Sequence, residues 1–350
     1  MFSGVGVIAV GLVHSLILKR DGSVWAAGQN DVGQLGDGSR TDRKTFVQVI
    51  SSGAQAVAAR FDHSLVLTQN GSVWVTGSNL HGQLGDGSLI DKDSFVRVVT
   101  SGAHEVATGQ RHSLVLKQDG SVWSTGRNQH RQLGDESTSV RTYFAKVVPN
   151  NVHAVAAGDL ASFIIKKDGS LWGTKADSRG FVQMVTVTQA VSAHADHILA
   201  LKRDGSVWAK GDNYEGQLGD GSTIDRTSFV RVLSGAQSVS VGQSYSFVHK
   251  HDGSLWATGL NHGRFGDGST TDSHIFVQVA SGAQAVVAGT LHSLMLKQDG
   301  TVWATGGNNN GQFGDGSTSD SASFVKVASL VSRRSGACRM PSIFNAHIIQ

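Results

Sequence analysis

Short runs that alternate apolar and polar residues recur along the chain, and they occur in pairs around an Asp-Gly or Asn-Gly dipeptide. The first pair reads HSLILKRDGSVWAAG at 14–28, and the last reads HSLMLKQDGTVWATG at 292–306. Such a dipeptide between two alternating runs is the strongest short-range signal for a β-hairpin. The pattern predicts seven hairpins, with turns at Asp21-Gly22, Asn70-Gly71, Asp119-Gly120, Asp168-Gly169, Asp204-Gly205, Asp252-Gly253 and Asp299-Gly300.

Two further strands flank each predicted hairpin. A run of small residues precedes the hairpin, such as AVAAR at 56–60. A long turn-rich loop follows it and leads into a fourth run, such as FVQV at 46–49. Each unit therefore has four strands, which we name A to D in chain order. Small residues in strand A suit a position near an axis, where bulky side chains from several strands would collide.

One tryptophan stands at the same place in every hairpin, and its recurrence measures the repeat. Neighbouring tryptophans are 36 to 49 residues apart, a period typical of propellers, solenoids and other arrays. Seven four-stranded units predict an all-β fold, a seven-bladed β-propeller of four-stranded antiparallel blades. The constant position in strand C predicts a structural role in packing between blades. The tryptophans are Trp25, Trp74, Trp123, Trp172, Trp208, Trp256 and Trp303.

The repeats define the domain organisation. The propeller occupies residues 1–330, and its fourth repeat, 152–187, is shortened because the loop between strands C and D is missing. We expect a closed ring with the N- and C-terminal strands adjacent, through lateral pairing of early and late strands. The apolar stretch 4–13 resembles the core of a secretory signal, but it fits the repeat as a strand. Residues 331–350 form a basic, nonrepetitive tail.

The antiparallel order of the strands assigns the connections to two faces. The A–B turns and C–D loops share one face, which we call the loop face. The Asp-Gly hairpins and D–A turns share the other, which we call the hairpin face. Sequence variation among the units concentrates on the loop face, which therefore predicts the place of any specific function.

Charge argues against a nucleic-acid ligand. The formal net charge is +3, from 30 Lys+Arg and 27 Asp+Glu, and the last twenty residues hold Arg333, Arg334 and Arg339 without an acid. The rest of the chain is neutral, whereas phosphate binding needs clustered cations. The single cysteine, Cys338, excludes an internal disulfide framework and a cysteine-based zinc site. No apolar run reaches the length of about 18 residues that a membrane-spanning helix needs, so we expect no membrane partner.

The repeated phrase G-x-x-H-S-L-x-L-K-x-D-G-S-V-W-x-x-G-x-N-x-x-G-Q-L-G resembles the repeat of the regulator of chromosome condensation family, over residues 5–330. The resemblance implies a propeller that presents one face to a protein partner, as most members do. Members include a nucleotide-exchange factor for the Ran GTPase, a plant ultraviolet-B photoreceptor, ubiquitin-ligase modules and a bacterial β-lactamase inhibitor. One fold with so many tasks does not specify a function by itself.

Two sequence differences from these members argue against two of their functions. The exchange factor uses an additional β-wedge, and no C–D loop here exceeds the common length; the photoreceptor has a tryptophan where this chain has Gln110. We therefore predict a non-enzymatic protein–protein interaction scaffold that uses no cofactor. Guanine-nucleotide exchange on a small GTPase is the alternative, and a secreted enzyme inhibitor is a weaker one. We expect the cytoplasm or nucleus, with secretion left open.

Recurring histidines and aspartates have structural explanations. Five units begin strand B with a histidine: His14, His63, His112, His197 and His292. Ala161 and Tyr245 stand there in units four and six. One histidine per blade cannot form a metal centre, so we expect hydrogen bonds from these rings to nearby backbone. The C–D loops carry paired acids such as Asp37 and Asp42, but calcium needs about six to eight oxygens, so we expect turns held by side chain–backbone bonds and no metal.

Variable side chains on a constant loop frame predict the partner-binding surface, although free drift of exposed loops gives the same pattern. The predicted residues on the loop face are Phe61, Asp62, His81, Gln110, Arg111, His130, Arg131, Asp159, Lys175, Arg179, Asp196, Tyr214, Glu215 and His262. The preferred anchors are Tyr214, Phe61, Arg111 and Arg131, because aromatic and arginine side chains dominate interface energetics. The shortened fourth unit should leave a notch, which either admits a partner loop or is a harmless deletion.

Overall fold

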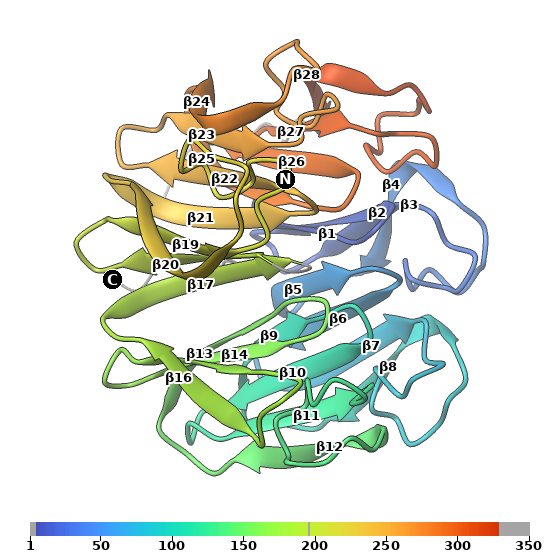
Figure 1. Ribbon diagram of the computed structural model, residues 1–350. Helices are drawn as coiled ribbons and strands as arrows, with labels where there is room; N and C mark the ends of the chain where they lie inside the picture. Colours follow the sequence, from blue (N-terminus) through green and yellow to red (C-terminus); the bar gives the residue numbers. More distant parts are fainter. Residues whose placement is uncertain (1–4, 195–196, 329–350) are drawn as a thin grey trace.

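Seven four-stranded antiparallel sheets form the blades of a ring in the computed structural model, which describes residues 5–194 and 197–328 (Figure 1). The predicted all-β, seven-bladed propeller is confirmed. Helices are absent from the described residues, and none there is available to cross a membrane. The basic tail, 331–350, lies outside the described residues.

The strands occupy four equivalent positions, A to D, from the axis outwards. Position A holds β1 (Val5–Val10), β5 (Ala54–Arg60), β9 (Ala103–Thr108), β13 (Val152–Ala157), β17 (Thr188–His194), β21 (Ala236–Gly242) and β25 (Ala283–Ala288). Position B holds β2 (His14–Lys19), β6 (His63–Thr68), β10 (His112–Lys117), β14 (Ser162–Lys166), β18 (His197–Lys202), β22 (Tyr245–Lys250) and β26 (His292–Lys297). Position C holds β3 (Val24–Gly28), β7 (Val73–Gly77), β11 (Val122–Gly126), β15 (Leu171–Thr174), β19 (Val207–Gly211), β23 (Leu255–Gly259) and β27 (Val302–Gly306). Position D holds β4 (Arg43–Ile50), β8 (Lys92–Val99), β12 (Arg141–Val148), β16 (Phe181–Val185), β20 (Arg226–Leu233), β24 (Ser273–Ala280) and β28 (Ser321–Ala328).

The ring closes by packing the first blade against the last. Each sheet contains four consecutive strands, so every D strand completes the blade of its own unit. The blue strand β1 contacts β25 and β26 of blade 7 (Figure 1). An isolated β-bridge between Thr45 and Asp315 joins the two blades, like the bridge between Asp37 and Ser94 at the first junction. The expected adjacency of the terminal strands is therefore present, but the early and late strands do not share a sheet.

The hairpin turns also fix the tryptophans. In the first hairpin Lys19 N donates to Ser23 O at 2.9 Å and Gly22 has a φ of 79°, a left-handed conformation that glycine adopts without strain. Asp21 accepts hydrogen bonds from the backbone and hydroxyl of Ser23. That hydroxyl accepts a bond from the Trp25 indole at 3.1 Å, while the Lys19 ammonium lies 3.7 Å from the ring centroid. Six tryptophans are thus held by their own turn and by a lysine of strand B, whereas the cation near Trp74 is Arg97 of strand D.

Apolar side chains pack mainly between blades. The cluster at the closure combines Ile8 and Ile17 of blade 1 with Leu294 and Val302 of blade 7. Fully burying each such side chain contributes about 1.5–3 kcal/mol. Six of the tryptophans pack against clusters of this kind: Trp25, Trp74, Trp123, Trp172, Trp256 and Trp303.

The axis is lined by short side chains, one from each A strand. At one equivalent position they are Val10, Ala59, Thr108, Ala157, Ala193, Val241 and Ala288, and other A-strand residues, including Arg60, line the axis as well. Hydrogen bonds between connections confirm the two faces. Gln29 N donates to Val13 O, which joins a C–D loop to an A–B turn, and Ala54 N donates to Gly22 O, which joins a D–A turn to a hairpin.

Candidate partner-binding face

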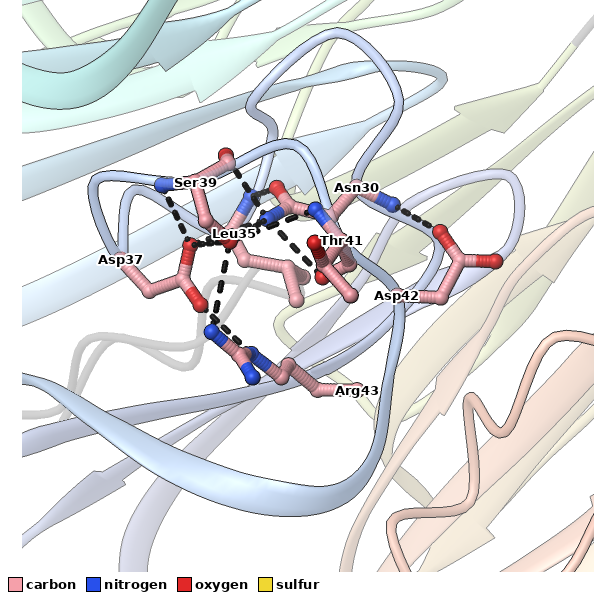
Figure 2. A network of polar contacts seen from close by, with 7 residues as sticks. All are labelled: Asn30, Leu35, Asp37, Ser39, Thr41, Asp42 and Arg43. Atoms are coloured by element: carbon pink, nitrogen blue, oxygen red, sulfur yellow. Dashed lines mark hydrogen bonds and ion pairs between the residues drawn. The ribbon is translucent and has the colours of Figure 1, made fainter.

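Each complete C–D loop is organised around one buried asparagine, as Figure 2 shows for Asn30. Its amide nitrogen donates to Asp37 at 2.9 Å and to the carbonyls of Ser39 and Thr41 at 3.0 and 3.2 Å. Its amide oxygen accepts a bond from Leu35 N at 3.0 Å, which places the leucine in the core. The equivalent residues are Asn79, Asn128, Asn213, Asn261 and Asn308.

The paired acids of these loops bind groups of their own loop. Asp37 accepts bonds from Ser39 and Arg43, the latter at 2.6 Å, and Asp42 accepts a bond from Asn30 N at 2.8 Å. Burial raises the pKa of Asp37, but hydrogen bonds from Ser39, Arg43 and Asn30 outweigh it and hold the pKa below its usual value. The predicted side chain–backbone bonds are therefore present, and they account for the spacing of the acids. In the described parts of the chain no three His, Cys, Asp or Glu side chains gather as a metal site.

Adjacent asparagines in the last loop offer a matched test of this frame. Asn308 is buried, and its oxygen accepts a bond from Phe313 N at 2.9 Å, whereas Asn309 is exposed. Asn308→Ala should lower the free energy of unfolding by about 2–3 kcal/mol, because a buried N–H loses its acceptor. Asn309→Ala should change it by less than about 0.5 kcal/mol. Urea unfolding of the two variants measures the difference, and equal losses would contradict the assigned role of the frame.

A ladder of hydrogen bonds joins neighbouring blades beneath the loop face. In each of the five histidines that begin strand B, the ring nitrogen Nε2 lies 2.8–3.0 Å from the hydroxyl of a serine in the next blade. The pairs are His14–Ser64, His63–Ser113, His112–Ser162, His197–Ser246 and His292–Ser15. In blade 6 the Tyr245 hydroxyl contacts Ser293 at 2.9 Å instead. The partner common to all five rings is a side chain from another repeat, which the sequence did not predict. The expected bond to backbone is present for His63, with Arg60, and for His197, with Tyr245.

The ladder fixes the protonation state of the histidines. Ser64 donates its hydroxyl proton to Gln34 O at 2.7 Å, so the His14 Nε2 must donate to Ser64. The other nitrogen, Nδ1, has no hydrogen-bond partner among the described residues in His14, His112 and His292. Burial lowers the pKa to about 3 for these three, so the rings are neutral. The ladder is therefore structural, and it keeps the C–D loops in register with the next blade.

A polar network crosses the axis at the loop face. The Arg60 guanidinium donates to Asp159 at 2.7 and 3.1 Å and to Ala193 O at 3.1 Å. The His194 imidazole lies 3.5 Å from the same carboxylate through Nδ1, and its Nε2 lies 3.3 Å from the Thr290 hydroxyl. Burial, followed by the nearby Arg60 charge, holds the pKa of His194 well below its usual value. Side chains from blades 2, 4, 5 and 7 thus cover the mouth of the channel.

Only Asp159 of this network was predicted as a functional residue. Arg60 and His194 were not singled out from the sequence. Both stand at a position that is glycine in the other five A–B turns. In blade 1 a Cβ at Gly11 would lie 2.1 Å from Cε1 of His14, which explains the glycine there. Blades 2 and 5 replace this glycine with Arg60 and His194, and that departure from the repeat is the signal that locates the network.

Three predicted residues gather at the rim of blades 2 and 3. Nη1 of Arg111 lies 2.9 Å from Nε2 of His81, and burial together with the Arg111 charge lowers the pKa of that histidine. Asp62 is half-buried, and its pKa is raised by burial and then by the Asp31 charge, while Arg111 lowers it. Arg111 is therefore held by the His81 ring, and its charge acts on the Asp62 carboxylate nearby.

The remaining predicted residues spread around the loop face. Tyr214 is 80% exposed, and His262, Lys175 and Arg179 are also exposed. Half-buried positions are Phe61, Gln110, His130, Arg131 and Glu215. Asp196 lies outside the described residues. The loop face thus carries differing side chains around its edge, and the Arg60–Asp159 network lies near its axis.

Comparison with known proteins agrees with this architecture. The family model described as Regulator of chromosome condensation (RCC1) repeat matches residues 8–34, 55–83, 103–132, 189–217 and 276–312. The chain contains repeats of the regulator of chromosome condensation type. No curated protein matches this RCC1-repeat chain in a sequence search.

Solved structures resemble the RCC1-repeat propeller in fold. Prp20p from Saccharomyces cerevisiae has a TM-score of 0.72 and 20% identity, over 83% of this chain and 82% of Prp20p. Human WBSCR16 has a TM-score of 0.72 and 21% identity, over 85% of this chain and 87% of WBSCR16. The ectodomain of the receptor kinase CR4 from Physcomitrella patens has a TM-score of 0.54 and 11% identity, over 87% of this chain and 74% of the ectodomain. Identities this low show a shared fold.

Proposed function

We propose that the chain is a non-enzymatic protein-interaction module that binds its partner through the loop face. The observation that supports this proposal is a contrast within the C–D loops, between their buried asparagines and the exposed side chains on the loop face. The asparagine frame and the histidine ladder hold every complete C–D loop rigidly, while the side chains presented outwards differ from blade to blade. A rigid scaffold lowers the entropy that the loops lose on binding.

The exposed residues suit a protein partner. Tyr214 is 80% exposed, and Arg111 is held by His81, so both side chains are available at little conformational cost. The structurally similar Prp20p was reported with its binding properties to Gsp1p and histones, which supports a macromolecular partner for this chain as well.

A capture experiment with two matched variant pairs tests the proposal. Tyr214→Ala with Arg111→Ala removes the anchors on the loop face, and Lys167→Ala with Arg203→Ala changes exposed residues on the hairpin face. The first pair should lower recovery of the captured partner at least about tenfold, because hot-spot truncation costs about 2 kcal/mol or more. The second pair should leave recovery unchanged. Equal recovery with both pairs would contradict binding through the loop face.

Guanine-nucleotide exchange on a small GTPase is the second candidate, favoured by the likeness to Prp20p. It predicts that the chain accelerates release of a fluorescent nucleotide from the GTPase, and that the loop-face pair abolishes the acceleration. Passive binding predicts capture of the partner without a change in nucleotide release.

A further inference from the structure

Every complete C–D loop covers the edge of the next blade. Two contacts recur at all six junctions: a loop glycine packs on a phenylalanine of strand D, and a loop carbonyl accepts a bond from a strand B serine. In the first loop, the carbonyl of Gly33 accepts a bond from the Thr76 hydroxyl at 2.8 Å. Gly36 packs against Phe95, so closely that a Cβ on the glycine would lie 2.4 Å from the ring. Strands C and D of blade 2 thus depend on the loop of blade 1 for partners. The carbonyl of Gln34 also accepts the hydroxyl of Ser64.

Blade 5 lacks this cover. The strands β15 and β16 of blade 4 are joined by residues 175–180 alone, where blade 1 has residues 29–42. No loop glycine from blade 4 reaches Phe229, which occupies the place of Phe95. Phe229 and Ile198 pack on one side against the blade 4 cluster that contains Phe163, and both stay half-buried.

The positions that would have bonded to the missing loop have also changed. Lys210 stands where five other blades have a threonine such as Thr76 and blade 1 has Ala27. Ile198 stands where all six other blades have the ladder serine. Ala161 replaces the histidine that would have contacted that serine. Blade 5 has therefore lost the groups that hydrogen-bond to a C–D loop in the other blades, and it has gained an apolar side chain and a cation there. We call Ile198, Lys210 and Phe229, with Lys175 of the adjoining turn, the blade 5 edge.

The charges at the blade 5 edge are unbalanced. The Lys210 ammonium lies 5.9 Å from the centroid of the Phe229 ring, and it is half-buried. Burial, followed by repulsion from Lys175, lowers the pKa of Lys210. Within residues 5–194 and 197–328 neither lysine forms an ion pair. Acids of the surrounding segments are Asp177 in the turn, Asp212 two residues after Lys210, and Glu136, whose side chain approaches Gly180.

We propose that the blade 5 edge binds an acidic turn of a partner protein, which occupies the place of the missing C–D loop. The carboxylate lies between Lys175 and Lys210, and an apolar side chain or backbone of the turn covers Phe229 and Ile198. The inference deepens the proposed function and rests on it, because it names one site on the loop face and the chemistry of the segment bound there.

The apolar floor distinguishes this site from one for nucleic acid. A phosphate backbone would use the two lysines but would leave the Phe229 and Ile198 side chains without a matching surface, apart from base stacking on one ring. A protein turn matches both parts, since the six complete loops of this chain show that turns of this length fit such an edge.

A cyclic peptide with the sequence of residues 213–225, NYEGQLGDGSTID, is a suitable probe because it has three acids, no cation and the length of a C–D loop. Fluorescence anisotropy should show saturable binding of the labelled peptide to the full chain. Lys210→Thr, which restores the residue found in other blades, should weaken binding at least tenfold, and Phe229→Ala should also weaken it. Lys167→Thr, on the hairpin face of blade 4, is the control and should leave it unchanged.

Other outcomes overturn the inference. The inference is wrong if the unaltered chain does not bind the peptide, or if binding is unchanged in Lys210→Thr. It is also wrong if a peptide whose three acids are replaced by amides binds equally well. Tighter binding of an oligouridine than of the peptide, with the same dependence on Lys210, would assign the edge to nucleic acid instead. If Lys210→Thr retains the captured partner while the Tyr214 and Arg111 pair loses it, the inference fails and the proposed function stands. If neither change affects capture, the proposed function fails.

Discussion

Between pH 7 and pH 5 the protein is expected to lose most of its stability. Burial lowers the pKa of four ladder histidines, His14, His112, His197 and His292, to about 3, and that of His63 to about 4. In the unfolded chain these rings have a pKa of about 6.5. Between those limits the unfolded state binds more protons than the folded state, so the free energy of unfolding falls as the pH falls.

The magnitude is large because five groups act together. Each ring contributes about 1.4 kcal/mol per pH unit below about pH 6, and the five together about 7 kcal/mol per unit. A folded domain has only about 5–15 kcal/mol to lose. Loop aspartates such as Asp37, whose pKa is lowered, weaken the fold in the same direction but only near and below about pH 4.

Urea unfolding at pH 7.5, 6.5, 5.5 and 5.0 measures this dependence. His292→Gln removes one titrating ring and should reduce the slope by about 1.4 kcal/mol per pH unit, whatever it does to stability at neutral pH. His262→Gln, an exposed histidine on the loop face, should leave the slope unchanged. A free energy of unfolding that stays constant from pH 7 to pH 5 would contradict the buried, neutral ladder.

Removing Arg60 should be the most damaging change at the channel mouth. The Arg60 and Asp159 side chains are only 14% and 13% exposed. Breaking a buried pair costs about 3–5 kcal/mol, because the remaining charge is left without its partner. Since both side chains keep some exposure to solvent, we expect Arg60→Met to lower the free energy of unfolding by about 3 kcal/mol.

A second variant separates loss of the pair from loss of packing. Arg60→Met combined with Asp159→Leu removes both charges and should recover at least half of the lost stability. Arg20→Met, at an exposed hairpin residue, is the control and should cost less than about 0.5 kcal/mol. If the double variant is as unstable as the sum of its single changes, the two charges do not act as a pair.

The repeat made the fold predictable, because each strand and hairpin is encoded locally. The alternation around Asp21-Gly22 specifies two strands and their turn within fifteen residues, 14–28, and the structure has β2 and β3 there. Because the antiparallel strand order repeats in every unit, the A–B turns and C–D loops must lie on one face. The strand order alone therefore identified the loop face.

The site was less predictable because its contacts cross repeats. The bond from His14 to Ser64 joins residues fifty positions apart, and that from Arg60 to Asp159 joins residues ninety-nine apart. Such pairs depend on how blades stack around the axis, and a local pattern does not contain that information. The departures from the repeat at Arg60, His194 and Lys210 mark these contacts, but the partners become apparent only in three dimensions.

The ladder also determines where the propeller is weakest. At the closure between the two ends of the chain, His292 and Ser15 form a normal rung, so the ends are well secured. Between blades 4 and 5, Ala161 and Ile198 form none, and no loop covers the joint. Transient opening needs the least free energy where restraints are fewest. The junction between blades 4 and 5, which retains its apolar packing but has no rung and no loop cover, should therefore open before the closure between blades 7 and 1 does.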